Sequence, residues 1–206
     1  MFGGLLLTAL AALWVVMSPA MQHLVIANPI LRFGLFIAEI GIVFYLSLRL
    51  TKMSPAAAAA AFLTFSVLNG LSLSVLAFAY TQASLVQAFV TAAGMFGAMS
   101  IYGTVTKRDL TSWGSFFMMG LMGVLLLMVI NIFMHSSAIN FTIGVVGIFV
   151  FLGLTAYDNQ KLKVYAHAGG GLQSNLAIIG ALRLYLDFVN LFLMLLRFTG
   201  GGCRRR

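Results

Sequence analysis

The chain has 206 residues, of which 62% are hydrophobic and only 8% are charged, and its mean hydropathy is +1.06. A soluble domain carries about 25% charged residues, so the composition excludes a water-soluble protein and predicts one integral membrane domain over residues 1–206. The formal net charge of +8 does not predict a nucleic-acid partner, because the basic residues lie in small groups between apolar runs and gather on no single face.

Seven transmembrane helices account for the apolar runs. Residues 1–31, 53–106 and 110–157 carry no Asp, Glu, Lys or Arg, and each run is longer than the roughly 20 residues that one span needs. Polar breaks divide them, and the period-two alternation of a β-barrel is absent. The sequence therefore predicts an all-α protein with helices near 2–17, 30–50, 56–79, 84–104, 112–134, 139–158 and 175–198, followed by a basic tail over 199–206.

The loops differ in charge. Those after the second, fourth and sixth predicted helices are basic, and those after the first, third and fifth carry no Lys or Arg. The positive-inside rule then predicts a cytoplasmic N-terminus. A full crossing by the last helix puts the C-terminus outside, against the preference of the three arginines in the tail. The basic loop residues are Arg49, Lys52, Lys107, Arg108, Lys161 and Lys163.

The last predicted helix, ALRLYLDFVNLFLMLLRF, carries a polar stripe. At about 100° per residue, Arg183, Asp187, Asn190 and Arg197 fall within an arc of about 80°. Charged groups in a span face the bundle interior or water, so this stripe is expected to face inward. Arg183 lies one turn from Asp187, which is close enough for a local ion pair.

Three further acidic residues complete the set. Asp109 follows Lys107 and Arg108 in a loop and is expected to be solvated. Glu39 lies nearer the middle of its span, so it is expected to be protonated or paired. Asp158 ends the sixth predicted helix, and two interpretations stay open. It is a helix-end residue among the headgroups, or it pairs with Asp187 across two helices, where neighbouring carboxyls share a proton and, once both ionise, suit a hard cation.

No catalytic pattern competes with these interpretations. The histidines, His23, His135 and His167, fall in three separate predicted loops, and no HExxH, GxSxG or P-loop motif occurs. An intramembrane protease also needs two aspartates on adjacent helices, but that class uses a GxGD pattern, and the contexts here are AYDN and YLDF. The sequence therefore predicts a protein that is not an enzyme.

Three segments resemble the Bax inhibitor-1 family, and in particular its bacterial branch. They are GLTAYDNQKLK (153–163), ALRLYLDFVNLFLMLLRF (181–198) and TAAGMFGAMSIYGTVTKRDLTSWG (91–114). The resemblance implies a last helix wrapped by the other six, a bacterial inner-membrane location and a pH-sensitive calcium leak without a cofactor. It also implies that Asp158 and Asp187 form the proton sensor and hold calcium transiently. An arginine near the end of the second helix latches the sensor, and Arg49 is the nearest match.

The sequence departs from this family in two places. Family members usually carry a cytoplasmic segment before the first helix, whereas here Met1 lies almost at that helix. Arg183 occupies a position expected to be small or polar and uncharged. A fixed cation beside Asp187 favours its ionised form, which predicts a shifted pH response or a weaker leak.

Two functions follow from the resemblance. The first is a channel for calcium, gated by protons. The second is a non-conducting interaction protein that restrains a membrane-bound, ATP-dependent protease, as bacterial relatives are linked to, or that acts in stress and cell-death control, as eukaryotic relatives do. Buried charges favour the first, because a pure binding module has little need of them.

Overall fold

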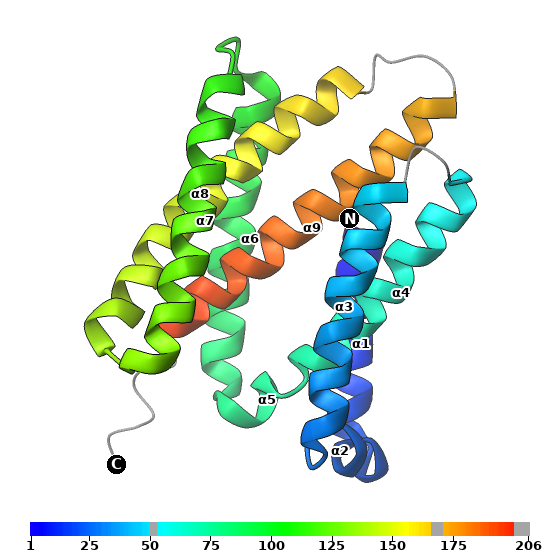
Figure 1. Cartoon of the computed structure of the whole chain (residues 1–206), viewed down its shortest axis with the longest axis vertical. Coiled ribbons are helices and arrows are strands. Elements are labelled where there is room, and N and C mark those ends of the chain that lie inside the picture. The colour runs from blue at the N-terminus through cyan, green and yellow to red at the C-terminus, as the bar shows by residue number, and fades with distance from the viewer. Residues whose placement is uncertain (50–52, 166–170, 200–206) are drawn as a thin grey trace. The chain divides into compact units, whose positions relative to one another are not determined.

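The computed structural model describes residues 1–49, 53–165 and 171–199 (Figure 1). Every regular element in these ranges is an α-helix, which confirms the predicted all-α class. Of the residues discussed above, Lys52, His167 and the tail from residue 200 onward lie outside the described part. The chain divides into two compact units, and each is described by itself.

Unit 1 comprises residues 1–80 and 165–185. Here α1 packs most extensively against α4, α3 packs on another part of α4, and α2 connects α1 with α3. The short α2 closes an apolar cluster in which Val15, Val25 and Leu35 are buried. Its helices are α1 Phe2–Met17, α2 Pro19–Val25, α3 Pro29–Arg49, α4 Pro55–Leu73 and α5 Leu76–Ala79. The unit also contains the first part of α9, a helix that runs over Gly171–Thr199 in full.

The helix starts in this unit follow from local chemistry. Proline is the first residue of α2, α3 and α4, a position where its missing N–H goes unused. The Asn28 side chain accepts the N–H groups of Ile30 and Leu31, and the Ser54 hydroxyl accepts that of Ala57. Such caps satisfy N–H groups that have no partner within the helix.

Unit 2 comprises residues 81–164 and 186–206. Its helices are α6 Gln82–Val105, α7 Thr111–Met134, α8 Ser137–Tyr165 and the second part of α9. α8 touches all three others through glycines. A Cβ on Gly103 of α6 would meet backbone atoms of α8, one on Gly153 of α8 would meet a Phe117 ring atom of α7, and one on Gly147 would come within 2.8 Å of Met194 Sδ of α9. The small residues therefore let three helices approach α8 closely.

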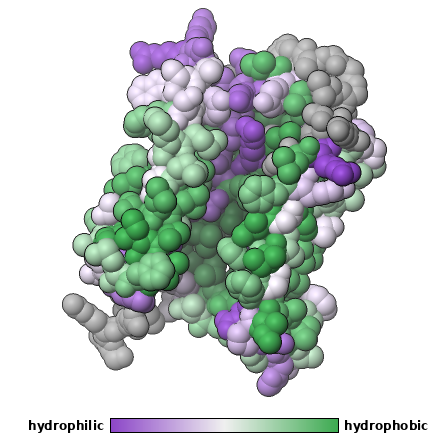
Figure 2. Space-filling model, viewed as in Figure 1, coloured by the Kyte–Doolittle hydropathy of each residue, from purple (hydrophilic) through white to green (hydrophobic). Residues whose placement is uncertain are grey.

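Six of the described helical segments are long and apolar enough to cross a membrane, and there are seven if α1 and α2, which bend by 105° at Ser18, together form one span. This agrees with the predicted number of spans. Figure 2 shows apolar side chains over much of the visible surface, as lipid contact requires. Exposed large side chains such as Phe44, Met122 and Phe149 are therefore expected to face lipid.

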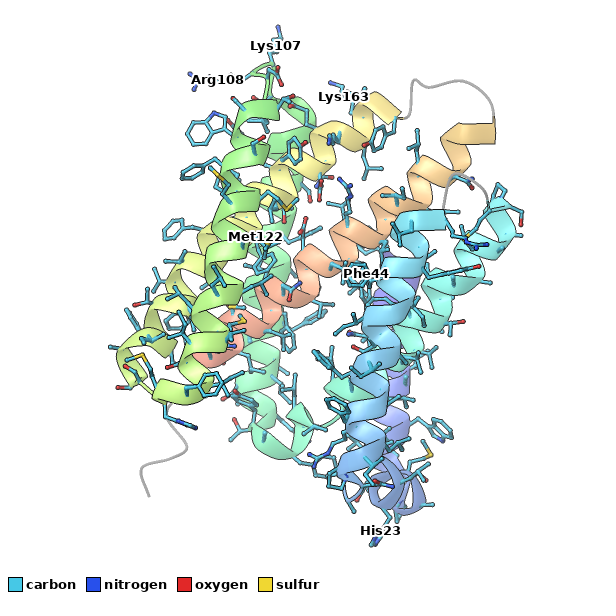
Figure 3. All side chains as sticks on the ribbon, viewed as in Figure 1. His23, Phe44, Lys107, Arg108, Met122 and Lys163 are labelled. Atoms are coloured by element: carbon cyan, nitrogen blue, oxygen red, sulfur yellow. The ribbon has the colours of Figure 1, made fainter. Side chains whose placement is uncertain are left out.

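Three predicted segments differ from the observed helices, and in addition α9 begins at Gly171 instead of residue 175. The predicted helix 56–79 is interrupted after Leu73, where the Ser74 hydroxyl donates to the Leu71 carbonyl and competes with regular backbone pairing. The predicted helix 139–158 continues to Tyr165, because its charged end contains helix-forming residues and neither Gly nor Pro. The polar break after residue 17 contains α2, and this places His23 in a helix (Figure 3).

Candidate functional site

Asp158 lies inside α8 and not at its end. About two further helical turns follow it, and only 8% of its surface is exposed. The interpretation of Asp158 as a helix-end residue is therefore wrong. The lysines at 161 and 163 are typical of a loop, but here they continue the helix.

The residues that flank Asp158 hold this turn in place through polar contacts with α6 and the loop after it. Asn159 Nδ2 donates to Ser100 Oγ of α6 at 3.0 Å. The Gln160 amide accepts from the Leu110 backbone N–H at 2.8 Å and donates to the Arg108 carbonyl at 2.7 Å. One side chain thus satisfies two backbone groups of the loop between α6 and α7, and it fixes that loop against α8.

Close packing supports the same turn from two sides. A Cβ on Gly103 of α6 would collide with the backbone of Ala156, and a Cβ on Gly114 of α7 would lie 2.5 Å from ring atoms of Tyr157. Lys161 Nζ lies 4.8 Å from the centroid of that Tyr157 ring, within the range of a cation–π contact. Asp158 is therefore carried by a segment with little room to move.

Asp187 lies on α9 with 5% of its surface exposed. The following residue, Phe188, packs edge-on against Phe89 and Phe96 of α6, with ring centroids 5.6 and 5.5 Å apart. Further along the predicted stripe, Asn190 Nδ2 donates within the helix to the Leu186 carbonyl. Asp187 is thus a buried carboxyl on a turn of α9 whose next residue packs against α6.

Helical geometry places Asp158 and Asp187 on facing sides of α8 and α9. Gly147 of α8 contacts Met194 of α9. Asp158 comes eleven residues after Gly147, which puts the two residues about 20° apart around α8. Asp187 comes seven residues before Met194, which puts these two about 20° apart around α9. Both carboxylates therefore share the faces on which the two helices meet.

Two registers agree on the level of Asp158 along α9. The antiparallel contact of Gly147 with Met194, continued along both helices, puts Asp158 about four residues from the level of Asp187. Counted through α6, where Asn159 pairs with Ser100 and Phe96 meets Phe188, the separation is about two residues. Either register leaves the two aspartates within about one turn, roughly 5 Å along the axis.

Glu39 occupies a second polar centre, which lies in unit 1. Its carboxylate oxygens accept from Asn69 Nδ2 at 3.3 Å and from Ser72 Oγ, both on α4. Glu39 is therefore paired with α4 through these hydrogen bonds, and its protonation stays a prediction.

The same polar chain continues through Tyr185, which is fully buried. Its hydroxyl donates to Asn69 Oδ1 at 3.0 Å and lies 2.6 Å from Thr8 Oγ1 of α1. Its ring packs edge-on against Phe62 and Phe65. One chain of polar groups therefore links α1, α3, α4 and α9 within unit 1.

Three basic residues complete the predicted site. Arg49 is the exposed last residue of α3, and Arg183 is half-buried on α9. Both belong to unit 1, whereas the two aspartates belong to unit 2, so the latch stays a prediction. Arg197 Nη1 donates to Asn140 Oδ1 at 2.9 Å, near the start of α8.

Asp109 is exposed in the loop before α7, as expected. The Thr111 hydroxyl and backbone N–H both donate to its carboxylate, and these bonds lower the pKa of Asp109 below its usual value. It therefore stays ionised throughout the neutral range. No group of three His, Cys, Asp or Glu side chains able to hold a metal occurs within residues 1–49, 53–165 and 171–199.

Two features of these centres were missed in the sequence, although signals for them were present. Thr8 is the one residue of α1 whose side chain carries a hydroxyl, an amide or a charge. A lone polar residue in a span commonly has an interior partner. Asn69 and Ser72 are three apart and so share a face of α4. Gln160, by contrast, gave no local signal, because its partners are backbone groups about fifty residues away.

The fold and these centres define a multi-pass integral membrane protein with carboxylates buried between its helices. The family model described as "Inhibitor of apoptosis-promoting Bax1" matches residues 1–204. The chain is 45% identical over 204 residues to the inner membrane protein YbhL of Escherichia coli K12, covering 96% of this chain and 86% of that protein. The chain belongs to the Bax inhibitor-1 family.

More distant relatives extend the same match. A protein of Rickettsia prowazekii is 42% identical over 200 residues, covering 95% of this chain and 84% of its own length. An uncharacterized membrane protein of Streptococcus pyogenes serotype M1 is 38% identical over 191 residues, covering 91% and 83%. The similarity therefore spans nearly the whole chain in each case, and the predicted family is confirmed.

Proposed function

We propose that this protein is a pH-sensitive calcium leak channel of the bacterial inner membrane, with Asp158 and Asp187 as its proton sensor. The proposal is supported by the burial of both carboxyls and by the contact of Gly147 with Met194, from which helix geometry puts them on the faces where α8 and α9 meet. Two carboxyls so placed titrate as a pair and share one proton. A location in the inner membrane follows the name of the Escherichia coli relative.

The setting of Asp158 explains how a proton could control the channel. The turn that carries it is fixed to α6 and the loop after α6 by Asn159 and Gln160. A change in repulsion between the two carboxyls therefore acts on the contact of α8 with α9, because α8 is held on its other sides. Such a local electrostatic change biases a closed–open equilibrium, and Arg49 would latch the closed state.

Calcium is the transported ion in this proposal and not a resident cofactor. Ionised carboxylates are suitable oxygen ligands for it. In this proposal Asp158 and Asp187 hold the ion in transit, with water completing its shell. Weak binding of this kind suits conduction, which requires that the ion leave as readily as it enters.

Calcium efflux from proteoliposomes across a range of pH tests the proposal. Asp158→Asn and Asp187→Asn are each expected to flatten the pH dependence of efflux, because an amide cannot share the proton. Asp109→Asn is the matched control, since it removes an exposed loop carboxylate, and it is expected to keep the wild-type profile. Both sensor variants keeping the pH dependence would refute the sensor, and no efflux from the wild type would favour the non-conducting interaction protein.

A further inference from the structure

Two side chains of α9 rest directly on glycines of α8 and close the seam between these helices. A Cβ on Gly147 would lie 2.8 Å from Met194 Sδ, and one on Gly144 would lie 2.7 Å from ring atoms of Phe198. The Phe198 ring also packs edge-on against Phe141, with ring centroids 5.5 Å apart. Met194 is 2% exposed and Phe198 is 38% exposed, so Met194 is the fully covered member of the pair.

These two contacts lie between two polar levels of the seam. Asp187 marks one level, and the other is the hydrogen bond from Arg197 Nη1 to Asn140 Oδ1. Arg197 comes ten residues after Asp187, which corresponds to a rise of about 15 Å along α9. This distance is half of the roughly 30 Å of hydrocarbon in a bilayer.

The polar side chains between these levels are bonded within their own helices or face α7. On α9 the only one is Asn190, which donates to a backbone carbonyl one turn back. On α8, Thr142 and Thr155 do the same, and the Tyr157 ring faces Gly114 of α7. The structure describes both stretches in full, and the seam between the two levels is therefore lined by apolar groups.

The contact of Met194 with Gly147 can open without any movement of the helices. Methionine is unbranched and has three rotatable bonds, so Met194 can leave the glycine by side-chain rotation alone. Because glycine has no side chain to fill the space, the rotation leaves a gap against the α8 backbone. Phe188 lacks this freedom, because it packs against both Phe89 and Phe96 of α6.

We propose that Met194 and Phe198 form a hydrophobic gate that stops water and calcium from passing along the seam between α8 and α9. This gate rests on the calcium leak proposed above, because the leak would have to open it for an ion to cross. An apolar constriction excludes water and ions until its side chains move apart. Both side chains lie on their glycines here, so the structure shows the gate closed.

Calcium efflux from proteoliposomes tests the two side chains of the gate. Met194→Ala and Phe198→Ala are each expected to raise the efflux rate at neutral pH about tenfold, because tenfold corresponds to a loss of only about 1.4 kcal/mol of closed-state packing. Met194→Leu nearly conserves the volume and should keep the wild-type rate. Met122→Ala is the matched control, because Met122 of α7 is 57% exposed, and it should also keep that rate.

Access of water beyond the gate gives a second readout, which does not depend on calcium. Leu191 is fully buried and lies between Asp187 and Met194 along α9. With the one native cysteine removed by Cys203→Ser, Leu191→Cys should react slowly with a charged methanethiosulfonate reagent on both sides of the bilayer. Met194→Ala should speed this reaction, and Met122→Ala should not. Circular dichroism, size-exclusion chromatography and retention of a trapped dye verify that the variants are folded and the vesicles intact.

The outcomes separate the gate from the leak on which it rests. Faster efflux together with faster labelling supports the gate. Wild-type efflux that Met194→Ala and Phe198→Ala leave unchanged would overturn the gate and keep the leak. No efflux from the wild type or from either variant would overturn the leak, and the calcium gate with it. Faster efflux without faster labelling would overturn the gate as well, because the ion would then take another path.

Discussion

Replacing Gly103 with alanine should weaken the packing of α6 against α8 next to Asp158. The added Cβ would collide with the carbonyl and Cα of Ala156. These are backbone atoms, so a side-chain rotation cannot relieve the collision and the two helices must separate. Overpacking costs about 1–3 kcal/mol, and the upper end of that range applies because the obstacle is rigid.

Gly97 is the matched control, because it lies on the same helix and a Cβ there would meet nothing within 4 Å. Alanine gains about 1 kcal/mol over glycine in a helix. Gly97→Ala should therefore raise the free energy of unfolding by about 1 kcal/mol. Gly103→Ala should lower it by about 2 kcal/mol, because the same gain offsets part of the overpacking cost of about 3 kcal/mol. The two variants should therefore differ by about 3 kcal/mol, or roughly a hundredfold in the unfolding equilibrium.

Reversible unfolding in mixed micelles of a mild detergent and SDS, followed by circular dichroism, measures this difference. Gly147→Ala gives an intermediate case, because its Cβ would meet the flexible thioether of Met194, which can rotate away. Its free energy of unfolding should fall between those of the other two variants. A Gly103→Ala protein as stable as Gly97→Ala would refute the close approach of α6 and α8.

Three further predictions concern single side chains. Tyr185→Phe keeps the ring but removes the hydroxyl that joins α9 to Thr8 of α1 and Asn69 of α4, so it should lower the free energy of unfolding by about 1–2 kcal/mol, whereas the exposed control Tyr102→Phe should change it by less than about 0.5 kcal/mol. Gln160→Ala should speed hydrogen exchange of the loop over residues 106–110, measured by mass spectrometry, while Gln87→Ala on the exposed face of α6 should not. Arg183→Ser should shift the midpoint of the pH dependence of calcium efflux, because it removes a cation one turn from Asp187, and an unchanged profile would contradict this role.

The helices were predictable where composition changes sharply. α1 runs over Phe2–Met17 as predicted, because an uncharged apolar run meets Ser18 and Pro19. The break after Leu73 was not predictable from hydropathy, because the sequence stays apolar on both sides. The predicted α8 is too short because charges such as those after Asp158 are typical of a loop, although a helix can extend beyond the hydrocarbon among headgroups.

The candidate site was predictable only where one helix carries the information. The polar stripe around Asp187 follows from the spacing of residues on α9. The chain from Thr8 through Tyr185 to Glu39 needed four helices in their places, and no single segment encodes it. The bracing of the Asp158 turn by Gln160 likewise depends on backbone groups that only the tertiary fold brings near.

The central claim is that Asp158 and Asp187 titrate as one pair. Calcium efflux across pH, compared between Asp158→Asn, Asp187→Asn and the double variant, tests it most directly. Two groups that act as a unit are non-additive, so either single substitution should remove the pH dependence and the double variant should add nothing. If each single variant keeps part of the pH dependence and the double variant loses the sum, the two carboxyls titrate independently and the account is wrong.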